Sequence, residues 1–228
     1  MTRITGISSM ATRQVLAELA AAFERESGLA VAIESVGGVD AAKRVEASEP
    51  FDVVILAANA IDRLVAGGHV LAGSIVDLVR SGVAIAVRAG AGRPDVGTEE
   101  AVREAVRRAR SVAYSTGPSG DHLAKLFERW GIAEDVRSRT VKPPPGVPVG
   151  TLVASGEVEL GFQQLSELAF LPGVDVVGPL PPAIQLVTVF SGGVCVNAPH
   201  PDEARRLLAF LASPQAAEAK HRNGMEPA

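Results

Sequence analysis

Short apolar runs of strand length alternate with segments of helical periodicity along most of this chain of 228 residues. The runs are rich in Val, Ile, Leu and Ala, and they lie at residues 4–7, 31–35, 53–56, 83–87, 112–114, 160–162, 174–177 and 187–196. Between the first two runs, the apolar side chains of residues 12–26 recur at the spacing of a helix with one buried face. Strands that alternate with helices usually pair in parallel through crossover connections. The sequence therefore predicts an α/β fold of mostly parallel sheets with helices on both faces.

The composition argues against a nucleic-acid partner, membrane insertion, a disulfide, a metal and a cofactor. The net charge is −4, and the Lys and Arg residues are scattered or lie beside Glu, so we expect no nucleic-acid surface. No stretch approaches the roughly 20 apolar residues of a membrane span, so we expect no membrane insertion. Cys195 is the single cysteine, which excludes an intrachain disulfide and favours a buried structural thiol. No His, Cys or carboxylate residues stand at ligand spacing, so we expect neither a metal nor a cofactor.

The last apolar run predicts how the chain divides into lobes. Residues 187–196 are long and rich in β-branched side chains, yet Gly192 and Gly193 interrupt them. Such a run so late in the chain suggests a strand that returns from one lobe to another. We place the matching outward crossing near residues 81–89. The expected lobes are residues 1–82 with 191–228 and residues 83–190, joined by two hinge strands.

The N-terminus leaves the location of the protein open. Residues 1–7 lead directly into the first expected strand, without the basic region, apolar region and cleavage site of a secretory signal. The protein is periplasmic if a signal peptide was removed and cytoplasmic otherwise.

Four junctions that follow strands are rich in glycine and small polar residues. They lie at residues 6–12, 35–43, 56–60 and 114–122. In open α/β sheets, ligands bind beyond the carboxyl ends of the strands. The start of a helix offers unpaired N–H groups and a partial positive charge there, and serine hydroxyls add further donors. Several such junctions could bind an anion without Lys or Arg, although each one alone could equally be an ordinary helix cap.

The order of these segments resembles the molybdate-binding type of the type II periplasmic solute-binding proteins. The resemblance covers essentially the whole chain, through GISSMAT, SVGGVDAAKRV, FDVVILAANAIDRL, STGPSGDHLAKLFERWGI, VASGEVELGFQQLSEL and FLASPQAAEAKHRNGMEPA. It implies a two-lobed fold that closes on a small anionic ligand, and an ABC transporter permease as a partner.

The resemblance also implies which residues bind the anion. They lie in the four junctions and in one loop that closes the cleft, and they are Ser9, Gly38 or Val39, Ala58 with Asn59, Ser119 with Gly120, and Gln163. Ser8 and Ser115, which lie in the same junctions, are added as further candidates from the sequence itself. Asp40, His122 and the glutamine pair at 163–164 are not what a plain tetrahedral oxyanion needs. These departures favour a larger organic anion such as a di- or tricarboxylate.

Two functions of different class remain open on the sequence. One is a binding protein that delivers a small anion to a transporter. The other is a cytosolic isomerase similar to the aconitate isomerases, which move a double bond in a small polycarboxylate by proton transfer. Such chemistry needs a base with a pKa near neutrality and a site that stabilises an enolate-like charge. His122 is the candidate base, with Asp40 or Ser115 assisting.

Overall fold

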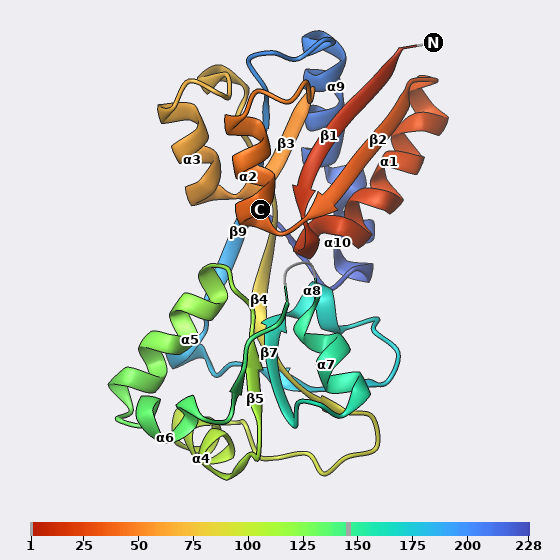
Figure 1. Ribbon diagram of the computed structural model, residues 1–228. Helices are drawn as coiled ribbons and strands as arrows, with labels where there is room; N and C mark the ends of the chain where they lie inside the picture. The colour runs from red at the N-terminus through yellow and green to blue at the C-terminus, as the bar shows by residue number, and fades with distance from the viewer. Residues whose placement is uncertain (1, 145–146) are drawn as a thin grey trace. The chain divides into compact units, whose positions relative to one another are not determined.

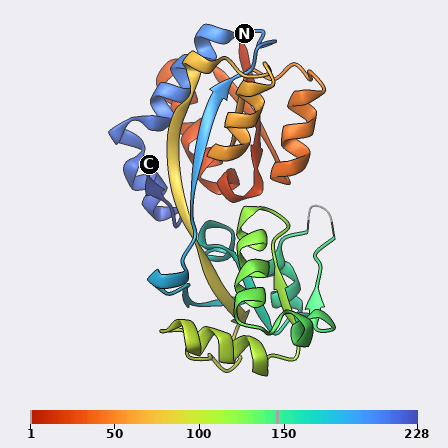
Figure 2. The same cartoon turned by 90° about the vertical axis from the view of Figure 1, so that its left-hand side faces the viewer.

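The computed structural model describes residues 2–144 and 147–228, and these form two compact units. Unit 1 runs to Arg80 and resumes from Val189 to Ala228, whereas unit 2 is the continuous segment Ser81–Thr188. The chain changes unit within two strands, β4 (Val76–Arg88) and β9 (Val187–Val194). These two strands are neighbours in the strand order and lie side by side in both views (Figures 1 and 2).

Unit 1 contains a sheet whose strand order is β2-β1-β3-β9-β4. Its parallel strands are β1 (Arg3–Ser9), β2 (Ala30–Val36) and β3 (Val53–Ala57). Strand β9 pairs antiparallel with β3, and the short β10 (Glu226–Pro227) pairs antiparallel with β4. The helices of this unit are α1 (Arg13–Ser27), α2 (Gly38–Glu46), α3 (Ala58–Ala66), α9 (Pro201–Ala212) and α10 (Ala217–Arg222).

Strand β3 shows why this sheet has helices on both faces (Figure 1). Val53 and Ile55 pack in the apolar cluster that holds α1 and α9, and Val54 and Leu56 pack in the cluster that holds α2 and α3. Successive side chains of a strand point to opposite faces, so a strand covered on both sides must be continuously apolar. This burial explains the unbroken run VVIL.

Unit 2 has the strand order β4-β7-β5-β6, with β8 (Val174–Pro179) also paired to β4. The parallel strands are β5 (Val112–Tyr114), β6 (Thr140–Val141) and β7 (Leu160–Gln164). Strands β7 and β8 run antiparallel to β4. The helices are α4 (Glu99–Arg108), α5 (Pro118–Arg129), α6 (Ala133–Arg137), α7 (Val149–Ser155) and α8 (Leu165–Leu168).

Both faces of the unit 2 sheet are buried as well. Phe127 of α5 lies at the centre of one face, with ring centroids 5.8 Å from Tyr114 and 6.4 Å from Phe162. On the opposite face, Leu168 of α8 packs on Ala84 and Ala86 of β4. The α/β class and the helices on both faces are confirmed, and the two crossing strands add antiparallel edges to each parallel set.

Two helices begin within the junctions at residues 35–43 and 114–122. From the sequence we expect them to start near Asp40 and Gly120, but α2 starts at Gly38 and α5 at Pro118. Proline suits the first position of a helix because its missing N–H would have no partner there. In the described part of the chain, no helix is long and apolar enough to cross a membrane.

Candidate functional site

The carboxyl ends of β1, β2 and β3 meet at one edge of the unit 1 sheet. Ser9 at the end of β1 is level with Val36 at the end of β2, and Ser8 is level with Ile55 of β3. Each strand is followed at once by helical turns, so the predicted residues of the first three junctions come together at this edge.

Ser8 and Ser9 are both buried, but their hydroxyl groups differ in their surroundings. The Ser8 hydroxyl is hydrogen-bonded to that of Ser35 on β2, with 2.8 Å between the oxygen atoms. The Ser9 hydroxyl has no hydrogen-bond partner among the residues that the structure describes. A buried unpaired hydroxyl costs about 1–3 kcal/mol. Ser9 is therefore the hydroxyl of this pair that is free to bind a ligand.

The start of α2 lies against Ser9. A methyl group on Gly38 would lie 3.8 Å from the Ser9 Cβ atom. Val39 follows with 57% of its surface exposed, a high value for an apolar residue at a helix start. Asp40 is exposed in the first turn, where a carboxylate stabilises the positive end of the helix dipole whether or not it does chemistry.

Helix α3 contributes the third group at this edge. Ala58 and Asn59 are its first two residues, with Ala58 partly buried and Asn59 exposed. The first N–H groups of a helix have no partner within the helix, so this start offers backbone donors. No Lys or Arg side chain is needed to make the edge attractive to an anion.

In unit 2, the junction after β5 brings Ser115, Ser119 and Gly120 together. The Ser115 and Ser119 hydroxyl oxygens are 2.7 Å apart, and Ser119 is buried. A methyl group on Gly120 would lie 1.6 Å from the Ser115 carbonyl oxygen, so only glycine fits there. One hydroxyl proton is used within the serine pair, which leaves the other for a ligand.

His122 lies in the second turn of α5 and is partly buried. Its Nε2 atom is 2.8 Å from the carbonyl oxygen of Ile184. A carbonyl only accepts, so Nε2 carries the proton and donates it in this bond. Only Nδ1 could then take a proton from a substrate.

Gln163 is buried at the end of β7, and both ends of its amide are engaged. Its Oε1 atom accepts a hydrogen bond of 3.0 Å from the Gly150 N–H at the start of α7. Its Nε2 group donates a hydrogen bond of 2.8 Å to the Glu167 carboxylate.

Glu167 is a residue that the sequence analysis missed. It lies in α8, directly after β7, and burial raises the pKa of its carboxyl to about 7, although the Gln163 hydrogen bond lowers that pKa. A carboxyl with such a pKa exchanges protons near neutral pH. The only signal in the sequence is a glutamate four residues after a glutamine in the run FQQLSEL, which is too common to single out.

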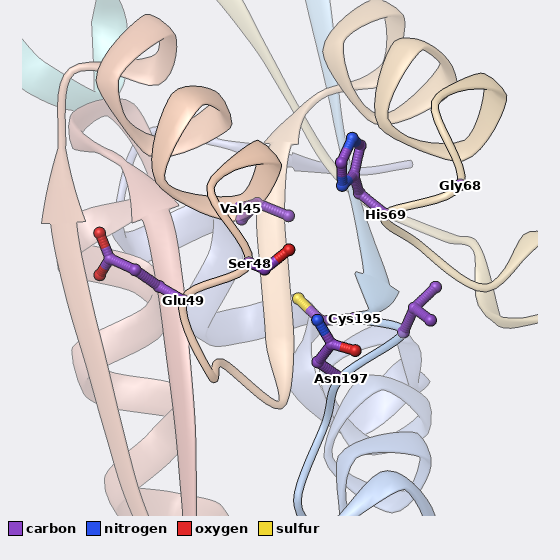
Figure 3. A pocket seen from close by; sticks show the side chains of 8 residues that line it. Val45, Ser48, Glu49, Gly68, His69, Cys195 and Asn197 are labelled. Carbon is purple, nitrogen blue, oxygen red and sulfur yellow. The ribbon is translucent and has the colours of Figure 1, made fainter.

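A separate pocket of about 260 Å³ in unit 1 contains Ser48, Glu49, His69, Cys195 and Asn197 (Figure 3). Cys195 N–H donates to the carbonyl of Asp52, the residue before β3, so this pocket lies at the opposite end of β3 from Ala58. Burial raises the pKa of the Cys195 thiol to about 12, with the charge of Asp52 adding to the effect. The thiol stays protonated, as expected of a structural cysteine.

A family model for bacterial extracellular solute-binding proteins matches residues 4–226. The chain belongs to this family. An aconitate isomerase from Pseudomonas sp is 40% identical to this solute-binding protein over 233 aligned positions, which cover 100% of this chain and 88% of the relative.

Solved structures of other solute-binding proteins have the same fold. The periplasmic molybdate-binding protein of Azotobacter vinelandii superposes with a TM-score of 0.81 at 20% identity, covering 97% of this chain and 98% of the other. The sulfate-binding protein SubI of Mycobacterium tuberculosis H37Rv superposes with a TM-score of 0.78 at 17% identity, covering 100% and 87%. These matches confirm the resemblance and the fold class that the sequence predicted.

Proposed function

We propose that this solute-binding protein is an isomerase that moves the double bond of a small unsaturated tricarboxylate, such as aconitate. The observation that carries the proposal is the 40% identity to an aconitate isomerase over the whole of this chain. Unit 2 alone supports it. The uncharged donors Ser115 and Ser119 follow β5, and the Glu167 carboxyl, which can exchange protons near pH 7, follows the neighbouring strand β7.

The donors at the strand ends would bind the carboxylates of the substrate. In unit 1, the candidates for this role are the Ser9 hydroxyl and the first N–H groups of α2 and α3, at Gly38, Val39, Ala58 and Asn59. In unit 2, taken by itself, they are Ser115, Ser119 and Gly120. Removing a proton from the carbon next to a double bond spreads negative charge onto a conjugated carboxylate. Fixed N–H and O–H donors stabilise such a charge more than water does, because they need not reorient during the reaction.

Isomerisation can be tested directly with cis-aconitate. The purified protein is incubated with cis-aconitate in deuterated buffer, and the vinyl and methylene signals are followed by proton NMR. We expect trans-aconitate to appear in proportion to the protein concentration. Tricarballylate, the saturated analogue, measures binding without turnover. If tricarballylate binds but cis-aconitate is not converted, the isomerase proposal is wrong.

The family match favours a second candidate, a binding protein that delivers a small anion to an ABC transporter. This function requires export, whereas an isomerase could work in the cytoplasm or the periplasm. A thermal-shift screen of molybdate, sulfate, tungstate and tricarballylate separates the two. A ligand present at 100 times its dissociation constant adds about 2.7 kcal/mol to the free energy of unfolding. A large shift with an inorganic oxyanion, without turnover of aconitate, would support the binding protein.

A further inference from the structure

The hydrogen bonds around Gln163 fix the position of the Glu167 carboxylate. The Gln163 amide is held on one side by the Gly150 N–H and donates to Glu167 on the other, at 3.0 and 2.8 Å. Gln163 is only 3% exposed, so its amide cannot exchange these partners for water at little cost. A glutamate on a four-residue helix is thereby anchored to the central strand β7 and to the start of α7.

Glu167 follows the strand that neighbours the serine pair. Strands β5 and β7 are parallel, and Tyr114 is level with Phe162, so Ser115 and Gln163 are the next residues at the same edge of the unit 2 sheet. The residues that follow β7 and those that follow β5 therefore lie at the same end of this sheet. This is the end at which ligands of α/β sheets bind.

Ser166, in the same short helix as Glu167, also has a polar group that is free to bind. Its side chain is buried, and its hydroxyl has no hydrogen-bond partner among the residues that the structure describes. It lies next to Glu167 in α8. Buried hydroxyls are nearly always paired, so a hydroxyl without a partner among the described residues is available to polar atoms of another molecule.

The charge environment of Glu167 differs from that of three other hydrogen-bonded glutamates. Glu49, Glu99 and Glu159 each bind an arginine side chain, and this interaction contributes to lowering the pKa of each carboxyl. Within the described ranges, no Lys, Arg or His lies within ion-pair distance of Glu167, and its one hydrogen bond comes from a neutral amide. Such a carboxyl can take up a proton and release it again without breaking an ion pair.

We propose that Glu167 is the catalytic residue that removes and returns the substrate proton, and that Gln163 is the residue that positions it. This inference rests on the isomerase function proposed above. It replaces His122, whose Nε2 atom is engaged with the Ile184 carbonyl, as the first candidate for the base.

The step balances without any further reactant. The Glu167 carboxylate takes a proton from the substrate methylene, and the electron pair of that C–H bond forms a new double bond to the central carbon. The electrons of the former double bond move onto the vinyl carbon and its carboxylate. The Glu167 carboxyl then returns the proton to the former vinyl carbon, which becomes the methylene. The glutamate is regenerated, and nothing is oxidised or reduced.

Replacing Glu167 by Gln tests the assignment, because the amide keeps the size of the side chain but cannot take the proton. We expect kcat for the conversion of cis-aconitate to fall by about 10²- to 10⁴-fold, the usual contribution of a general base. Binding of tricarballylate, measured by calorimetry, should change less than tenfold. Glu157→Gln is the matched control, since Glu157 is an exposed glutamate of the same unit, and it should keep the wild-type rate.

Gln163→Met tests the positioning role, because methionine has a similar shape but forms neither hydrogen bond. We expect kcat to fall at least tenfold with little change in KM, whereas general unfolding of the site would raise KM as well. If E167Q does not fold, E167D is measured instead. Its carboxylate is withdrawn by one methylene, so kcat should fall in this variant too. A wild-type kcat in a folded E167Q or E167D variant would show that Glu167 is not the base. The proposal that the protein is an isomerase would not be affected. A wild-type protein that binds tricarballylate and does not convert cis-aconitate defeats the proposed function itself.

Discussion

Ser9 has a hydroxyl without a hydrogen-bond partner among the described residues, whereas the hydroxyl of its neighbour Ser8 is bonded to Ser35. The two serines can therefore be compared by mutation. Replacing Ser9 by Ala removes no internal hydrogen bond of the described residues, so thermal stability should stay the same or rise slightly. Binding of tricarballylate should weaken by about 1–3 kcal/mol, the value of a hydrogen bond to a charged group. Calorimetry and thermal melts measure the two effects on one preparation.

The Ser8→Ala variant is the control for this prediction. It breaks the bond to Ser35 between β1 and β2 and should lower the free energy of unfolding by about 1 kcal/mol. A Ser9→Ala variant that loses stability and keeps full affinity would show that its hydroxyl is structural.

Ionisation of Glu167 should affect activity and stability in opposite directions: as the pH rises, activity should increase and stability should decrease. Its pKa is about 7 in the folded protein, against an ordinary value of 4.5, so the folded state holds this proton more tightly than the unfolded state does. Stability from this group is complete below pH 4.5 and is lost as the pH rises through 7, by about 3 kcal/mol at most. The carboxylate that acts as base is formed over the same range, so kcat should rise. Chemical denaturation and initial rates at pH 5, 6, 7 and 8 check both trends against E167Q, which should show neither.

At the scale of elements, the sequence predicted strands best where both faces of the strand are buried. The runs at 53–56 and 83–87 were predictable as strands because both faces of each are covered, which requires continuous apolar residues. Helix starts were less predictable, because their positions depend on single residues such as Pro118. The direction of β7 was not predictable. It runs antiparallel to its neighbour β4, and this pairing is set by the path of the chain between the two strands.

The start of α5 makes a prediction at this scale. A methyl group at Gly120 would overlap the Ser115 carbonyl, so Gly120→Ala must displace either the end of β5 or the first turn of α5. We expect a loss of more than about 2 kcal/mol in the free energy of unfolding, together with weaker tricarballylate binding. Gly131→Ala is a useful contrast. Its methyl group meets no atom within 4 Å, but its φ of 68° carries a moderate cost, and binding should be unaffected.

The candidate site could be predicted only in part, for a physical reason. Ser9, Gly38, Ser115, Ser119 and Gly120 were predicted because they lie in the segments where strands end and helices begin, and the structure has strand ends and helix starts in these segments. That they bind a ligand stays a prediction. Glu167 could not be found, because its raised pKa arises from burial, which the sequence does not display. The hydrogen bond between His122 and the Ile184 carbonyl joins residues that are 62 positions apart, so it could not be predicted from the sequence either.

At the scale of the whole molecule, the serine donors of each unit can be tested separately, with Ser9→Ala in unit 1 and Ser119→Ala in unit 2. We expect each variant to weaken tricarballylate binding by about 1–3 kcal/mol, the value of one hydrogen bond to a charged group. Calorimetry measures the affinity and the stoichiometry of both variants. An unchanged isotherm in either variant would show that the donors of that unit do not bind tricarballylate.

The return of the chain through β9 also has a consequence for synthesis. Unit 2 is one continuous segment, so all of its residues are present once Thr188 has been made. The parallel strands of unit 1 are translated first, yet the strand that covers the apolar β3 edge lies near the end of the chain. While the ribosome works, that edge is open to pairing with other nascent chains. The first part of unit 1, up to Arg80, therefore completes its sheet only after β9 has been made, and we expect chaperones to bind this part of the nascent chain.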